Sequence, residues 1–315
     1  MPRPRMLDLL GRGPEDVVVD ATGRIITGLE DGRILRVSPD GSGVEVLAHT
    51  GGHPLGVEVD RDGTVVICDC RRGLLRLDPG NGSLVDLVSA GDVVGDLPLG
   101  LCNNSAIGGD GTIYFSDSSS RFTQPWWKAD LFEHSGTGRL LRRDPNGRCE
   151  VLAGGLQFAN GVALAPDETF VLVAETGAYR ITRVWLSGPS AGTTDVFADN
   201  LPGFPDNLST GTDGLLWIAI GSPRSPVLDH LLPRPPILRR ALWALPPRLQ
   251  PDPVDTAWVM AMTFGGELVH DLQDRIPGFF MVTGVREHCG TVYLGSLHGR
   301  AVAALELSPA SSTTP

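Results

Sequence analysis

Four residues with oxygen-bearing side chains occupy one position relative to a recurring turn. Each stands eight residues before the residue that closes a short turn rich in Asp and Gly: Glu15, Asn103, Asn160 and Asp206. Leu55 and Val282 hold this position in two further copies. Carboxylate and amide oxygens suit Ca²⁺, and the absence of sulfur and imidazole from the set disfavours zinc and copper. Turn formation by Asn and Asp is the alternative, but it does not explain why all four residues stand at the same position relative to the turn. We therefore expect a Ca²⁺ site, with another divalent cation left open.

The turn belongs to a hairpin pattern that recurs six times. Its copies are VVVDATGRIITG at 17–28, VEVDRDGTVVICD at 57–69, AIGGDGTIYFSD at 106–117, VALAPDETFVLVAET at 162–176, LSTGTDGLLWIAIG at 208–221 and VREHCGTVYLGS at 285–296. Alternating apolar residues around a tight turn predict β-hairpins. The closing residues 23, 63, 111, 168, 214 and 290 are 40 to 76 residues apart, and about 40–50 residues is typical of a propeller blade.

This repeat predicts an all-β fold, a six-bladed β-propeller that forms a single domain over 1–315. The short N-terminal segment is expected to close the last blade. Because the first strand of each blade lines the central channel, the four oxygen-bearing residues should converge on the propeller axis.

Two steps of the repeat are longer than a blade requires. The excess lies in residues 118–137 and 222–264, which we expect to cap one end of the propeller. The segment VLDHLLPRPPILRRALWALPPRL in the second insertion is apolar and basic, and it predicts one or two short amphipathic helices. A packed cap is the simplest interpretation. A lid, a membrane-surface contact or a homodimer contact through 222–250 are the alternatives.

The composition excludes some classes of protein. A net charge of −11 argues against a nucleic-acid partner, which requires a basic surface. Five cysteines in 315 residues do not form a disulfide framework, and no stretch approaches the roughly 20 apolar residues of a membrane span. No signal peptide is recognised. The composition thus predicts a cytoplasmic protein without a transmembrane segment.

Further polar residues are candidates for contacts with a substrate. His53 precedes the channel position of the second unit by two residues, His298 follows the second strand of the last unit, and His134 lies in the first insertion. Asn104 and Asn207 directly follow two of the predicted metal ligands. We expect His53, Asn104, His134 and Asn207 to bind substrate above the metal, with His298 as a candidate catalytic residue.

Several longer segments resemble a known family. CNNSAIGGDGTIYFSDSSSRF, GRLLRRDP, FANGVALAPDETFVLVAET and LPGFPDNLS are similar to the strictosidine-synthase-like family, which includes the adipocyte plasma-membrane-associated proteins. That family is part of a six-bladed group with gluconolactonases, regucalcins and paraoxonases. The resemblance implies the same fold, and it implies a catalytic Ca²⁺ held by Glu15 in GPED, Asn103 in CNNS, Asn160 in FANG and Asp206 in PDN.

Two positions depart from members of this group. The glutamate that serves as base in strictosidine synthase is matched by Thr283, which argues against alkaloid synthesis because a threonine hydroxyl does not abstract a proton at neutral pH. The histidine that paraoxonases place over the metal is matched by Leu55, with His53 two residues away.

The leading hypothesis is a Ca²⁺-dependent hydrolase of a lactone or aryl ester, with Asp206 or His298 as the general base. A non-catalytic propeller that binds a ligand or partner around a structural metal is the second hypothesis. A biosynthetic enzyme of the strictosidine-synthase type is the third, and Thr283 disfavours it.

Overall fold

The computed structural model describes residues 1–307, and they form six four-stranded antiparallel sheets. The last eight residues of the predicted 1–315 domain lie outside the described residues. The first blade comprises β2 (Val17–Val19), β3 (Ile25–Gly28), β4 (Arg33–Val37) and β5 (Val44–His49). The second comprises β6 (Pro54–Val59), β7 (Val65–Asp69), β8 (Gly73–Asp78) and β9 (Ser83–Ser89). The third comprises β12 (Cys102–Ile107), β13 (Ile113–Asp117), β14 (Gly138–Arg143) and β15 (Cys149–Leu156).

The remaining blades repeat this order. The fourth comprises β16 (Ala159–Leu164), β17 (Phe170–Glu175), β18 (Arg180–Trp185) and β19 (Thr194–Ala198). The fifth comprises β20 (Gly203–Thr210), β21 (Leu216–Pro223), β22 (Ala257–Met262) and β23 (Leu268–Asp274). The sixth comprises β24 (Val282–His288), β25 (Thr291–Ser296), β26 (Ala301–Glu306) and, from the other end of the chain, β1 (Arg5–Asp8).

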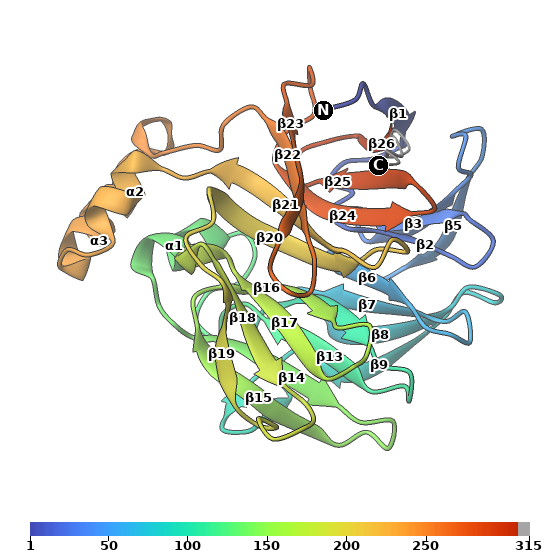
Figure 1. The fold of residues 1–315 in the computed structure, drawn as a ribbon, viewed down its shortest axis with the longest axis horizontal. Helices are drawn as coiled ribbons and strands as arrows, with labels where there is room; N and C mark the ends of the chain where they lie inside the picture. The colour runs from blue at the N-terminus through green and yellow to red at the C-terminus, as the bar shows by residue number, and fades with distance from the viewer. Residues whose placement is uncertain (308–315) are drawn as a thin grey trace, which may run out of the picture.

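The first strand of each blade contacts the first strand of the next, from β2 through β6, β12, β16 and β20 to β24 and back to β2. These contacts close a ring, which confirms the predicted six-bladed propeller (Figure 1). The predicted closure is also confirmed, because β1 pairs with β26 in the register Arg5↔Ala304 to Asp8↔Ala301. The two ends of the described chain therefore lie side by side (Figure 1).

The cores lie between neighbouring blades. Val18 and Ile26 of the first blade pack with Val57 and Ile67 of the second, for example, and these side chains are buried. The middle strands β7 and β13 are buried along their whole length, whereas most residues of the outer strand β9 are exposed or only partly buried. This gradient follows from the architecture, because two blade faces cover a middle strand and an outer strand lies at the rim.

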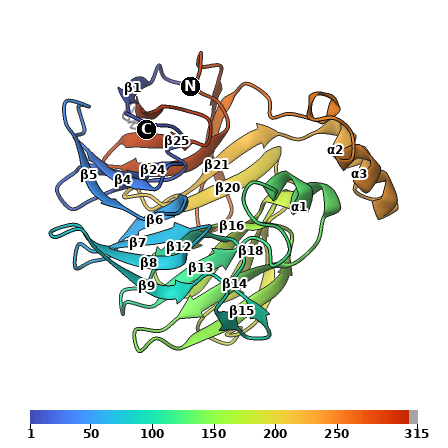
Figure 2. The same ribbon diagram turned by 180° about the vertical axis from the view of Figure 1, so that it is seen from behind.

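Helices occur mainly in the two predicted insertions. The first contains α1 (Trp127–Glu133), and the second contains α2 (Pro226–Leu231), α3 (Pro236–Trp243) and the 3₁₀ turn η2 (Pro247–Leu249). Figures 1 and 2 show α2 and α3 projecting together beyond the sheets, with α1 on the same side. The second insertion is shorter than 222–264, because β22 begins at Ala257 and is the third strand of its blade. A 3₁₀ turn, η1 (Thr176–Ala178), and a small hairpin, β10 (Val93–Val94) with β11 (Leu97–Pro98), were not predicted.

The N-terminal strand should contribute measurably to stability. Leu7 of β1 is buried with Tyr293 and Val302 of the sixth blade and Val17 of the first. Leu7→Ala should lower the free energy of unfolding by about 2–5 kcal/mol, because it removes buried methyl groups and leaves a cavity. The neighbouring Met6 is half exposed, so Met6→Ala should change it by less than about 1 kcal/mol. Equal effects of the two substitutions in urea denaturation would contradict closure through β1.

Candidate metal centre and cleft

The inner strands are irregular at the positions that carry the oxygen ligands. The pairing register shifts between Cys102 and Ser105 in β12, between Ala159 and Val162 in β16, and between Pro205 and Leu208 in β20. A bulge re-aims the side chains of the residues inside it. Asn103, Asn160 and Asp206 each fall within such a shift, which turns their side chains away from the regular alternation of the strand.

Glycine permits the close approach of neighbouring inner strands at this level. A Cβ atom on Gly161 would lie 2.1 Å from the backbone nitrogen of Leu208 in the next blade. No side chain fits there without moving the backbone. In the N-G pair of FANG, Asn160 is therefore the predicted ligand, and Gly161 lets the neighbouring ligand-bearing strand approach.

The structure brings the four predicted ligands together in a group that we call the ring. Glu15, Asn103, Asn160 and Asp206 border one small cavity of about 40 Å³, together with Leu55 and Thr283. All four side chains are at least 90% buried. Asn103 Oδ1, Asn160 Oδ1 and Asp206 Oδ1 have no hydrogen-bond partner among residues 1–307. Burying polar oxygens without a donor is costly, so three of them around one cavity indicate a place for a cation.

Two hydroxyl groups orient the ring amides. Asn103 Nδ2 donates to Ser118 Oγ at 2.9 Å, and Ser118 Oγ donates to the carbonyl of Ala159 at 2.7 Å. Thr176 Oγ1 likewise accepts from Asn160 Nδ2 at 3.1 Å and donates to the carbonyl of Pro205 at 2.7 Å. Because each hydroxyl proton is used on a carbonyl, each oxygen must accept from the amide nitrogen. The amide oxygens are therefore the atoms left for the cavity.

Sequence reasoning missed Ser118 and Thr176. Each lies directly after the second strand of its blade, in the segments FSDS and VAET. That shared position was a usable signal, since comparing the repeats at this phase would have found both hydroxyl residues.

Asn207 contributes differently from its predicted role. Its Nδ2 donates to Glu15 Oε2 at 3.1 Å, and its fully buried Oδ1 has no partner among residues 1–307. It therefore orients Glu15 and carries a further unpartnered oxygen, while its contact with a substrate stays a prediction.

Asn104 also differs from the prediction. Its Nδ2 donates to Asp16 Oδ2 at 3.0 Å, and its Oδ1 accepts from the backbone N–H of Val162 at 2.9 Å. Both ends of the amide are thus engaged inside the protein, and Asn104 links β12 to β16 and to the residue before β2. Its contact with a substrate stays a prediction.

The electrostatics of the ring fit a cation. Burial, with the nearby charges of Asp206 and Asp16, raises the pKa of Glu15 well above its usual range. Burial also raises the pKa of Asp206 to about 8. Among residues 1–307, no three His, Cys, Asp or Glu side chains form a metal-binding cluster. The ring instead combines two carboxylates with amide oxygens, which is a donor set for a hard cation such as Ca²⁺.

The three histidines do not join this ring. His53 is buried and its backbone N–H donates to Asp69 Oδ1 at 2.9 Å, and burial lowers its pKa. His134 ends α1, and its Nε2 lies 3.0 Å from the carbonyl of Gly177. His298 is exposed and packs on Phe280. Among the described residues that border the ring cavity and the cleft beside it, none is a histidine. The predicted substrate contacts of His53 and His134 and the predicted catalytic role of His298 stay predictions, without support from the lining of these two cavities.

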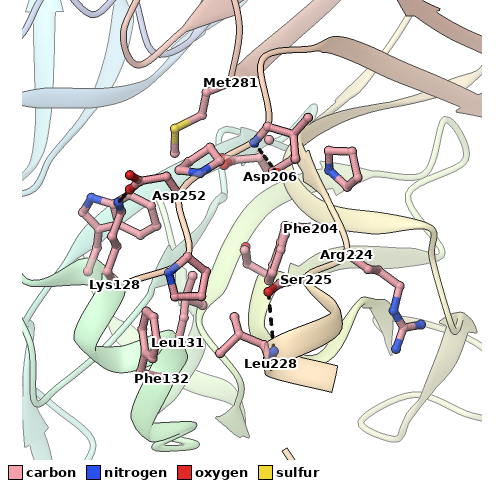
Figure 3. Close-up of a pocket in the computed structure, with 18 of the residues that line it drawn as sticks. Lys128, Leu131, Phe132, Phe204, Asp206, Arg224, Ser225, Leu228, Asp252 and Met281 are labelled. Atoms are coloured by element: carbon pink, nitrogen blue, oxygen red, sulfur yellow. Dashed lines mark hydrogen bonds and ion pairs between the residues drawn. The ribbon is translucent and has the colours of Figure 1, made fainter. Parts of the chain in front are cut away.

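An apolar cleft of about 210 Å³ lies beside the ring, between the two insertions. α1 contributes Leu131 and Phe132, α2 contributes Leu228, and β20 contributes Phe204. Figure 3 shows Asp206 at the inner end of the cleft, away from α1 and α2. Trp127, Thr176, Asp206 and Met281 border both cavities, so the cleft opens onto the ring. Lys128 Nζ and Asp252 Oδ1, 3.0 Å apart, join the two insertions across the cleft.

A six-bladed propeller with an oxygen-lined axial site beneath an apolar cleft is the class of protein that this fold and site define. Two family models match the sequence: "Strictosidine synthase" over residues 104–189 and "Strictosidine synthase-like, N-terminal" over residues 4–37. The adipocyte plasma membrane-associated protein of Salmo salar is 34% identical over 327 residues, which cover 94% of this chain and 76% of that protein. The chain belongs to the strictosidine synthase-like family, which includes these membrane-associated proteins.

Solved structures share the fold at lower identity. A gluconolactonase from Xanthomonas campestris superposes with a TM-score of 0.69 at 21% identity, covering 98% of this chain and 90% of that one. A calcium-binding regucalcin from Agrobacterium tumefaciens superposes with a TM-score of 0.66 at 14% identity, covering 97% and 94%. At these identities the similarity establishes the propeller fold.

The predicted cytoplasmic location is wrong. The relative from Salmo salar is named a plasma membrane-associated protein, as are relatives from several other vertebrates. Composition could not show this, because a propeller has the same core in either setting. Within residues 1–307 there is no helix with both the length and the apolar character needed to cross a bilayer.

The hydroxyl groups behind the ring should affect cation affinity. Thr176→Val should weaken Ca²⁺ binding by about 10–100-fold, because Asn160 loses the acceptor that keeps its oxygen toward the cavity. Calorimetric titration with Ca²⁺ measures this, with the exposed Thr22→Val as the matched control. Unchanged affinity in Thr176→Val would show that the amide is oriented by something else.

The raised pKa of Asp206 predicts how stability depends on pH without a cation. Between the unfolded value of about 3.9 and the folded value of about 8, the folded state binds more protons, so Asp206 makes stability fall as pH rises. In chelator, raising the pH from about 6 to about 8 should lower the free energy of unfolding of the wild type relative to that of Asp206→Asn. Ca²⁺ should reduce this shift by favouring the carboxylate. A pH-independent difference in urea denaturation would contradict the burial of a charged Asp206.

Proposed function

We propose that the chain is a Ca²⁺-dependent hydrolase of a lactone or aryl ester. The observation that carries the proposal is the juxtaposition of unpartnered buried oxygens with an apolar cleft that shares Asp206 with them. The cleft would hold the apolar part of a substrate. Its carbonyl would then lie at the boundary where the cleft meets the ring.

The ring residues would hold the cation through the oxygens of Glu15, Asn103, Asn160, Asp206 and Asn207. Bound there, a divalent cation would polarise the substrate carbonyl and make a bound water more acidic. Another divalent cation of similar size would satisfy the same donor set.

Asp206 is the proposed general base. It is the carboxylate that borders both the ring cavity and the cleft, so a water that attacks a carbonyl at this boundary lies within its reach. One oxygen of this carboxylate would ligate the cation, and the other would accept the proton. Thr176 keeps the amide oxygen of Asn160 toward the cavity, and neither residue transfers a proton.

The comparisons support this choice of reaction. The Xanthomonas campestris neighbour is described as a gluconolactonase, and the Agrobacterium tumefaciens neighbour as a calcium-binding protein. A lactone and Ca²⁺ are therefore compatible with propellers of this shape.

The other two hypotheses predict different outcomes. A propeller that binds a ligand around a structural metal would use the same cleft and ring without turnover. For a condensing enzyme, the structure offers no base at Thr283, whose Oγ1 donates to the carbonyl of Glu15 at 2.7 Å. Its buried hydroxyl thus serves to hold β24 against the first blade.

Hydrolysis of lactones and aryl esters, screened with chelator and with Ca²⁺, tests the proposal. Activity should disappear in chelator and return with Ca²⁺. Asp206→Asn should lower kcat by about 10²–10⁴-fold, because an amide can still ligate a cation but cannot accept a proton. Asp96→Asn, which is exposed and lies outside both the cleft and the ring, is the matched control and should retain kcat.

Two results would count against the hydrolase. Full activity in Asp206→Asn would exclude Asp206 as the base. Ca²⁺ binding without turnover of any lactone or ester would favour the ligand-binding propeller instead.

A further inference from the structure

The second insertion differs in charge from the rest of the chain. Residues 224–250 contain five arginines and one aspartate, whereas the whole chain has a net charge of −11. This projecting element therefore carries a formal charge of +4, whereas the rest of the chain carries −15 (Figure 1). Such a concentration sets up a local field opposite to that of the remaining surface.

One arginine holds this element together from within. Arg239 of α3 is buried, and its Nε donates to the carbonyl of Phe132 at 3.0 Å. Its Nη2 donates to the carbonyl of Glu133 at 3.3 Å, and its Nη1 donates to carbonyls at the end of α2 and beyond it: Leu231, Leu232 and Arg234. One guanidinium thus binds the C-terminal ends of α1 and α2 to α3. This contact fixes which side of α3 faces inward.

The opposite side of α3 is apolar and faces solvent. Ile237 is 66% exposed and Leu238 is 41% exposed, and Leu249 in the following 3₁₀ turn is 60% exposed. Trp126 of the first insertion is 57% exposed, and its ring centroid lies 6.4 Å from that of Trp243 in α3. Since Arg239 anchors the inner face of α3, Ile237 and Leu238 cannot turn inward without breaking its five contacts.

Two arginines that flank α3 in the sequence have no acidic partner among residues 1–307. Arg234 and Arg248 are exposed and form no ion pair with any residue of the described part of the chain. Arg240, in contrast, pairs with Glu133 at 2.9 Å. The two insertions therefore expose aliphatic and aromatic groups, and the second also exposes uncompensated positive charge.

We propose that this surface, made of Trp126, Ile237, Leu238, Leu249, Arg234 and Arg248, docks onto an anionic phospholipid bilayer. An amphipathic helix with arginines beside its apolar face lies in the interface between headgroups and acyl chains. α3 has eight residues, so it would rest on the bilayer and not cross it. A second copy of the chain fits less well, because a two-fold contact would bring together two copies of the same positively charged surface.

The second insertion also contributes to the cleft. Leu228 of α2 lines the cleft, while its neighbour Val227 is 47% exposed. The same insertion thus forms one wall of the cleft and the docking surface. This docking does not depend on the proposed hydrolase activity, and each can fail without the other.

Flotation of the full chain with vesicles tests the proposal. The chain should float with vesicles of phosphatidylcholine and phosphatidylserine at 3:1, and at least 10-fold less with phosphatidylcholine alone or in 1 M salt. Ile237→Asp with Leu238→Asp should weaken binding at least 10-fold, and so should Arg234→Ser with Arg248→Ser. The matched controls are Val85→Asp and Arg275→Ser, which are exposed on the propeller body and should bind as the wild type does.

A second readout reports the orientation. Brominated phospholipids should quench part of the tryptophan fluorescence, and Trp126→Phe should remove that part. Near-UV circular dichroism checks that every variant retains the wild-type fold.

Three results would overturn the proposal. They are no flotation of the wild type, equal flotation with neutral and anionic vesicles, or folded double variants that bind like the controls. If the variants instead change the oligomeric state in sedimentation velocity and leave flotation unchanged, the surface is a contact between copies of the chain.

Discussion

The side chains of Glu15, Asn103, Asn160 and Asp206 meet at one cavity. Within the described part of the chain, Oδ1 of Asn103, Asn160 and Asp206 receives no hydrogen bond. In an apolar interior this arrangement is unfavourable, and two carboxylates close together repel each other. Burial accordingly raises the pKa of both carboxyl groups, to about 8 for Asp206. A cation at this point would reverse each of these costs, and it would do so at the place where inner strands from four blades meet.

The ring also explains features of the fold that would otherwise be defects. The register shifts in β12, β16 and β20 interrupt regular pairing, and each contains a ring residue. Gly161 allows the backbone of the next blade to pass within a distance that no Cβ atom tolerates. Ser118 and Thr176 then bridge neighbouring blades while they orient the amides. The same contacts that close the propeller therefore shape the candidate metal centre.

The repeat made the propeller and its ring predictable, because equivalent positions of a repeat must fall at equivalent places around an axis. The roles of Asn104 and Asn207 were not predictable, since they depend on partners such as Asp16 and Glu15 that are distant in sequence. The end of the second insertion was also placed too late. AWVMAM at 257–262 lacks the alternation of a half-buried strand, because β22 is buried on both faces. Histidines were expected at the site from spacing alone, and spacing does not determine where a side chain points.

Crystals grown with Ca²⁺ and measured for anomalous scattering test the central claim most directly. We expect one strong peak on the propeller axis, about 2.3–2.6 Å from oxygens of Glu15, Asn103, Asn160 and Asp206. The amide nitrogens of Asn103 and Asn160 should still face Ser118 and Thr176. No peak at the ring in excess Ca²⁺, with amide nitrogens turned inward to bond the two carboxylates, would contradict a cation site there.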